Sequence, residues 1–97
     1  MFILLTYDID GNESEDKKRL RKVAKICEKY GVRVQNSAFE LIVDNKELVF
    51  LKNELKNIIK NDDSIRFYKL GRNYKNDIET LGNENKIELK NDNAIIF

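Results

Sequence analysis

The stretch FILLTYDI, residues 2–9, decides the fold of this chain. Strand-forming and mostly apolar residues run without a break up to Asp8, so both faces of the strand are expected to be covered. A strand of this kind lies in the middle of a sheet, with helices packed on one side. It ends in a carboxylate, Asp8, and a second carboxylate, Asp10, precedes Gly11. Alternate residues of a strand share a face, so the two acids can point the same way at the edge of the core.

Helix and strand patterns follow this first strand in turn. The patterns predict a helix at 14–30, a strand region at 32–44, a helix at 46–60 and a strand at 64–70. The polar residues Gln35-Asn36-Ser37 interrupt the second strand region, which predicts either one kinked strand or a tight pair of short strands. After Gly71 the pattern weakens: IETL is read as a short strand, and NAIIF as a last apolar segment.

The first helix is amphipathic. Ser14 or Asp16 can cap its start, and Gly31 is expected to end it as the C′ residue. Apolar side chains recur at i, i+3, i+4 and i+7, which predicts one buried stripe along the helix. The stripe consists of Leu20, Val23, Ala24, Cys27 and Tyr30.

This order of elements predicts an α+β fold, the ferredoxin-like βαββαβ sandwich, with an antiparallel sheet and two helices on one face. Residues 1–82 form this domain, and residues 83–97 form a C-terminal tail with a short strand. The sheet face away from the helices also needs a cover. A second copy of the chain is the simplest cover, so we expect a homodimer.

Composition limits the chemistry that the chain can do. Its 97 residues fit one small domain, and 18 basic against 17 acidic residues give a net charge of only +1. Histidine is absent from the sequence, which removes the commonest general base and the commonest transition-metal ligand. The single cysteine, Cys27, lies on the apolar stripe and is expected to be buried. No signal peptide or membrane-spanning run is visible, so a cytoplasmic protein without membrane contact is expected.

Positive charge is concentrated in the first helix. Residues 14–30 carry seven basic and three acidic side chains, although the whole chain is almost neutral. A basic helical face can neutralise nucleic-acid phosphates in a salt-sensitive way, but it can also be an ordinary solvated surface. The candidate nucleic-acid-binding residues are Lys17, Lys18, Arg19, Arg21, Lys22 and Lys25.

Asp8 is the candidate metal ligand. Mg²⁺ prefers oxygen ligands, keeps several waters and takes one or two carboxylates, and a bound ion can activate water against a phosphodiester. The alternative is that Asp8 and Asp10 are ordinary turn residues. Two carboxylates make an incomplete site in one chain, whereas two chains meeting at a dyad can supply the rest.

The remaining candidates are hydroxyl and aromatic side chains. A hydroxyl at Ser37 can orient water or phosphate, although a structural role in a bulge is the simpler reading. Three aromatic side chains can stack on bases or fill the core: Tyr7, Phe67 and Tyr68.

Several short elements match one family in order and spacing. They are Tyr7-Asp8-Ile9, Arg19 with Leu20, Tyr30-Gly31, Val34-Gln35 with Ser37, Phe39 and Glu40, and Ile65-Arg66-Phe67-Tyr68 with Leu70. Over residues 1–82 the sequence resembles the small CRISPR-associated endoribonuclease family, the second universal CRISPR adaptation protein and partner of the CRISPR integrase.

The resemblance implies a homodimer in which Asp8 lies near the dimer axis, where the two copies share a Mg²⁺ ion. It implies a scaffold that holds double-stranded protospacer DNA for the integrase, with metal-dependent cleavage of RNA or duplex DNA as a secondary activity. A rival hypothesis is that the protein is a true nuclease, in which Asp8 carries the activity and Ser37 and Phe39 shape the site. The C-terminal segment Ala94 to Phe97 would pair with the other subunit or dock on the integrase. A toxin-like messenger-RNA interferase of the same fold is the alternative.

Overall fold

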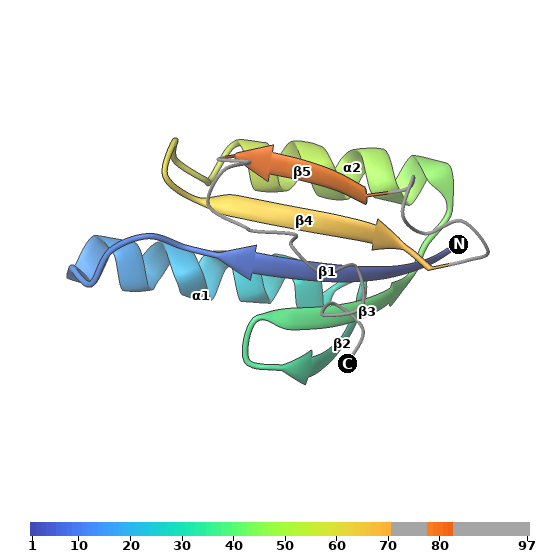
Figure 1. Ribbon diagram of the computed structural model, residues 1–97, viewed down its shortest axis with the longest axis horizontal. Coiled ribbons are helices and arrows are strands. Elements are labelled where there is room, and N and C mark those ends of the chain that lie inside the picture. Colours follow the sequence, from blue (N-terminus) through green and yellow to red (C-terminus); the bar gives the residue numbers. More distant parts are fainter. Residues whose placement is uncertain (71–77, 83–97) are drawn as a thin grey trace.

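The computed structural model of the chain describes residues 1–70 and 78–82 (Figure 1). Within them the elements are β1 (Phe2–Asp8), α1 (Ser14–Glu28), β2 (Gly31–Gln35), β3 (Ala38–Ile42), α2 (Asn45–Lys56), β4 (Ser64–Lys69) and β5 (Ile78–Gly82). The interrupted second strand region is therefore a pair of short strands. The IETL segment is a strand, as the sequence predicted. The tail 83–97 and its proposed contacts lie outside the described residues.

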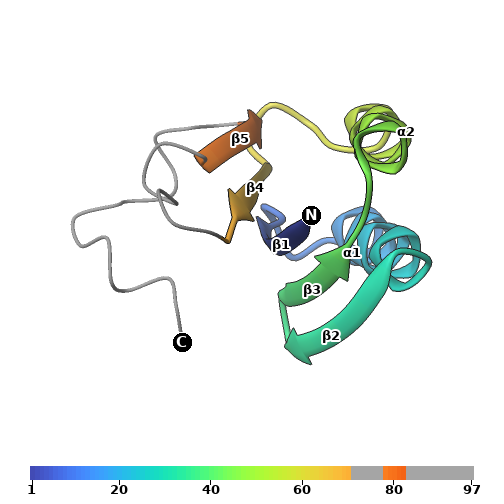
Figure 2. The same ribbon diagram turned by 90° about the vertical axis from the view of Figure 1, so that its right-hand side faces the viewer.

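The five strands form one sheet in the order β2-β3-β1-β4-β5, and every neighbouring pair is antiparallel. Both helices pack on the same face of this sheet (Figure 2). This arrangement confirms the predicted ferredoxin-like fold, with β5 added beside β4. The strand that begins the chain, β1, lies between β3 and β4 in the middle of the sheet, as predicted. The face that carries Leu4 and Thr6 is only partly buried.

The core fills the space between the sheet and the two helices. Alternate residues of β1 (Ile3, Leu5 and Tyr7) point toward the helices and are buried. Phe39 and Leu41 of β3 belong to the same cluster. The helices contribute the buried side chains Val23, Ala24, Ile26, Cys27, Leu48, Leu51 and Leu55. Among the described helices, none has the length and apolar character needed to cross a membrane.

Two details of α1 differ from the prediction. Leu20 is 40% exposed, whereas Arg19 is 7% exposed, so the inward stripe contains Arg19 in place of Leu20. The helix ends at Glu28, and Gly31 is the first residue of β2. Positive φ angles in the described chain occur at Gly11 and Gly82, so Gly31 is not a left-handed C′ residue. A side chain at Gly31 would instead collide with the Glu40 carbonyl of β3.

The start of α1 also differs in detail. The N-cap residue is Glu13, and its backbone N–H donates to the Asp16 carboxylate over 3.0 Å. Of the two predicted caps, Asp16 therefore contributes, from the third helical position. The second helix begins one residue earlier than predicted and ends at Lys56, four residues before the predicted end.

The sheet face away from the helices is only partly open in the single chain. Arg66 and Tyr68 point to this face from β4 and are 4% and 2% exposed. On the β2–β3 side of the same face, Val32 and Ile42 are 68% and 79% exposed, and Phe2 pairs with Ile42 in register. The exposed apolar side chains of this face therefore lie over β1, β3 and β2, and the homodimer stays a prediction.

Candidate nucleic-acid interface and carboxylate site

The outer face of α1 carries the predicted basic surface. Five of the six candidate residues are exposed: Lys17, Lys18, Arg21, Lys22 and Lys25. We call these five residues the α1 basic face. The last lysine of the region, Lys29, is engaged elsewhere, because its Nζ lies 2.8 Å from the Glu54 carboxylate of α2.

The sixth candidate, Arg19, does not lie on this surface, so that part of the prediction is wrong. Its Nε donates to Asp63 Oδ2 over 2.6 Å, and its Nη1 donates to Asp16 Oδ1 over 3.0 Å. Its Nη2 donates to the Asp10 carbonyl over 2.9 Å. Arg19 therefore joins α1 to the loop after β1 and to the turn before β4, and its guanidinium is occupied inside the fold.

Asp63 is the centre of this network, and no pattern in the sequence marked it as a functional residue. It is fully buried, and it accepts hydrogen bonds from the backbone N–H groups of Asp10 and Lys60, each over 2.8 Å. Burial alone would raise the pKa of the Asp63 carboxyl. The hydrogen bonds from Arg19, Lys60 and Asp10 outweigh burial and lower that pKa below its ordinary value. The carboxylate is thus charged at neutral pH and fixes three segments at one end of the sheet.

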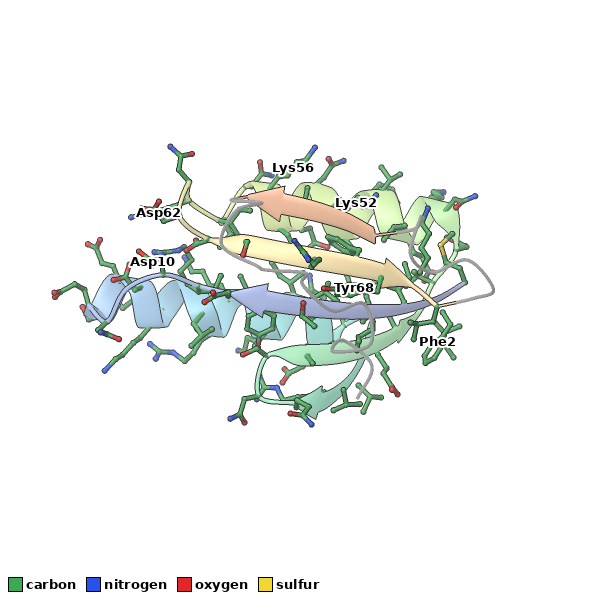
Figure 3. All side chains as sticks on the ribbon, in the orientation of Figure 1. Phe2, Asp10, Lys52, Lys56, Asp62 and Tyr68 are labelled. Carbon is green, nitrogen blue, oxygen red and sulfur yellow. The ribbon has the colours of Figure 1, made fainter. Side chains whose placement is uncertain are left out.

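Asp8 lies at this same end of the sheet, as the last residue of β1, and its side chain is exposed. It pairs in register with Ser64, the first residue of β4, so the two side chains share one face. The Ser64 hydroxyl is buried and has no hydrogen-bond partner within the described part of the chain. Figure 3 shows Asp10 on the loop after β1 and Asp62 on the turn before β4, at this same end of the sheet.

Asp8 is the predicted metal ligand, and a Mg²⁺ site at this position stays a prediction. Among the described residues there is no cluster of three or more acidic, histidine or cysteine side chains that can hold a metal. Asp8 supplies one exposed carboxylate, which fits the share that one subunit gives to a Mg²⁺ ion that keeps most of its waters. One carboxylate would need further ligands to hold an ion, and the hypothesis of an ion shared by two copies stays a prediction.

The two residues predicted to act with Asp8 lie in different places. Ser37 is exposed in the β2–β3 turn. Its carbonyl accepts the Tyr7 backbone N–H over 3.0 Å, which places the turn beside the end of β1. Phe39 is 0% exposed and faces the helices, where its ring stacks on Tyr7 at a centroid distance of 6.2 Å. Successive side chains of a strand point to opposite faces, and Tyr7 and Phe39 occupy the face that Asp8 does not. The prediction that Phe39 contributes to catalysis is therefore corrected: it is a core residue.

Other reactive or aromatic side chains are structural in the single chain. Burial raises the pKa of the Cys27 thiol to about 12, so it stays protonated at neutral pH. Tyr7 and Phe67 are at most 5% exposed and belong to the core cluster, whereas Tyr68 is 2% exposed on the opposite face of the sheet. Two of the predicted features are on the surface of the described part of the chain: the α1 basic face, on a helix, and Asp8, on the sheet face away from the helices.

Comparison with known proteins now gives the family. The model of the family described as CRISPR associated protein Cas2 matches residues 1–78. The chain belongs to the Cas2 family. The matched range covers nearly all the described elements, so the assignment rests on the whole sandwich and not on one motif.

Characterised relatives and a solved structure agree with this assignment. The CRISPR-associated endonuclease Cas2 of Halalkalibacterium halodurans is 50% identical over 93% of this chain and 95% of its own length. The CRISPR-associated endoribonuclease Cas2 3 of Rhodospirillum rubrum is 44% identical over 90% of this chain and 93% of its own. The crystal structure of Streptococcus pyogenes Cas2 is 51% identical, with a TM-score of 0.69 over 84% of this chain and 100% of that chain.

Proposed function

We propose that the chain is a homodimeric adaptor of CRISPR spacer acquisition, which binds the backbone of duplex DNA along α1 and holds it for the integrase. The observation that carries this proposal is the α1 basic face. Five exposed cations lie on one helix of a chain whose net charge is +1. Membership of the Cas2 family supports a role in CRISPR systems over the alternative of a messenger-RNA interferase.

The spacing of the charges suits a phosphate backbone. Lys17, Arg21 and Lys25 follow one another at four-residue intervals, about 6 Å apart along the helix axis. One DNA strand presents a phosphate about every 3.4 Å of helix axis, so each cation can pair with roughly every second phosphate. Such contacts release counterions and carry no sequence information, as an adaptor for varied DNA requires.

The exposed apolar side chains on the sheet support the homodimer. Phe2, Val32 and Ile42 lie on neighbouring strands of the face that the helices do not cover. Apolar residues gathered in this way are typical of a surface that another protein covers. A second copy placed there would also bring the β1 strands of the two subunits closer, as sharing a metal between two Asp8 residues requires.

Duplex binding by the purified protein tests the adaptor proposal. In the variant Lys17→Ala/Arg21→Ala/Lys25→Ala we expect the slope of log K against log salt to fall by about 2.7, since each lost phosphate contact contributes about 0.9. The measurement is fluorescence anisotropy of a labelled duplex between 50 and 200 mM salt.

The control for this variant is Lys46→Ala/Lys56→Ala, which removes two exposed lysines from α2. We expect its salt slope to match that of the wild-type protein. An unchanged slope in the α1 variant would rule out the α1 basic face as the DNA contact.

A second candidate activity, Mg²⁺-dependent phosphodiester hydrolysis, is favoured by one observation. Asp8 presents an exposed carboxylate at the end of a buried central strand, beside the buried Ser64 hydroxyl. Relatives of the chain bear the names endonuclease and endoribonuclease. In this activity the ion would activate water, and Asp8 would hold the ion against the scissile phosphate.

A further inference from the structure

A pocket of about 290 Å³ lies where the first half of α1 meets the end of α2. Lys18, Arg19 and Lys22 line it from α1, and Asn57 and Lys60 line it from the segment that follows α2. We propose that this pocket binds one backbone phosphate of the DNA that binds the α1 basic face, and we call it the phosphate seat. The inference rests on the proposed function. It adds residues outside α1, from the segment after α2, to the surface that contacts DNA.

The charge of the pocket suits an anion. Lys18 and Lys22 stand one helical turn apart on α1, and Lys60 lines the same pocket from the segment after α2. Glu15 is the one acidic side chain among the lining residues, so the three lysines outnumber it. Asn57 adds an amide that can donate a hydrogen bond to a phosphate oxygen. The volume of about 290 Å³ is larger than one phosphate, so the pocket can admit a backbone phosphate together with water.

The two walls are fixed relative to each other by the buried ion pair. Arg19, on the α1 wall, bonds Asp63 through Nε over 2.6 Å. The Lys60 N–H donates to Asp63 Oδ2 over 2.8 Å, and the Asp63 N–H donates to the Lys60 carbonyl over 3.0 Å. The backbone of Lys60 is therefore held to the helix that carries Lys18 and Lys22. Arg19 is a positioning residue here: it does not contact the phosphate but holds the lysines that do.

A site fixed in this way binds its ligand without a further ordering cost in the backbone, which raises affinity relative to loose surface lysines. Lys60 also lies outside the helix that the sequence marks as basic. A contribution from Lys60 to DNA binding therefore separates this seat from a simple basic helix.

The test compares Lys60→Ala with Lys56→Ala, a matched exposed lysine that does not line the pocket. We expect Lys60→Ala to bind a labelled duplex about three- to tenfold more weakly at 150 mM salt and to lower the salt slope by about 0.9. Lys60→Arg, which keeps the charge, should retain most of the affinity, and Lys56→Ala should bind like the wild-type protein.

Two outcomes separate this seat from the adaptor proposal. If Lys60→Ala and Lys56→Ala have the same slope while the Lys17/Arg21/Lys25 variant loses affinity, the seat is overturned and the adaptor proposal stands. If the Lys17/Arg21/Lys25 variant binds normally, the adaptor proposal fails. Thermal unfolding of Lys60→Ala should match that of the wild-type protein, so a weaker duplex affinity reports on binding and not on folding.

Discussion

Replacing Arg19 by alanine is expected to lower the free energy of unfolding by about 3 kcal/mol, measured by urea denaturation at pH 7. The change leaves the fully buried Asp63 carboxylate without its cationic partner. Removing one member of a buried ion pair costs about 3–5 kcal/mol, because the remaining charge stays desolvated. The lower end applies here, since the backbone N–H groups of Asp10 and Lys60 still donate to Asp63.

The matched control is Arg21→Ala on the same helix, where the side chain is exposed. We expect that change to stay within about 0.5 kcal/mol of the wild-type protein. An equal loss in both variants, or no loss in Arg19→Ala, would contradict the structural role of Arg19.

The pH dependence gives a second readout of the same ion pair. The folded protein lowers the pKa of Asp63, so the pair stabilises the protein above the unfolded value of about 3.9. This contribution is lost as pH falls through the lower, folded pKa. The difference between the wild-type protein and Arg19→Ala should therefore be constant above about pH 5 and shrink in acid.

Replacing Asp8 by asparagine is expected to lower the rate of Mg²⁺-dependent cleavage of RNA or duplex DNA by at least about 100-fold. The affinity for duplex DNA should be unchanged. Asparagine keeps the size of the side chain and removes the charge that attracts the ion. Because Asp8 is exposed at the end of β1, the fold should tolerate the change to within about 0.5 kcal/mol. The measurement is cleavage of labelled RNA and duplex substrates with and without Mg²⁺.

Glu28→Gln is the control, because Glu28 is an exposed carboxylate at the end of α1, away from the proposed dimer surface. Its cleavage rate should equal that of the wild-type protein. Cleavage that survives in Asp8→Asn, or that proceeds equally well with EDTA, would rule out Asp8 as the metal ligand.

The fold could be predicted from the sequence because its signals are local. The apolar run before Asp8 marks a central strand, and the turn residues 35–37 mark the break between β2 and β3. Element ends were predicted less well. Gly31 was taken for a left-handed helix end, whereas its missing side chain accommodates the Glu40 carbonyl of the neighbouring strand. That contact joins two strands, and no local pattern encodes it.

The candidate site was predicted in part for the same reason. Helical spacing placed the α1 basic face correctly, but it could not separate Arg19 from its basic neighbours, because the partner Asp63 lies 44 residues away. Asp63 itself looked like part of a polar helix end. No local signal marked Arg19 as buried, because Leu20 continues the regular spacing of the apolar stripe and itself looked like the inward residue. Phe39 was misplaced because a family resemblance gives the position of a residue without the face toward which it points.

The central claim is that the chain acts in spacer acquisition by holding DNA through α1. The most direct test is integration of a spacer into a supercoiled plasmid by the cognate integrase, with wild-type protein, the Lys17/Arg21/Lys25 alanine variant and Asp8→Asn. The account predicts that the α1 variant loses integration while Asp8→Asn retains it. Full integration by the α1 variant, together with loss in a correctly folded and dimeric Asp8→Asn, would contradict the account and assign the function to the carboxylate site.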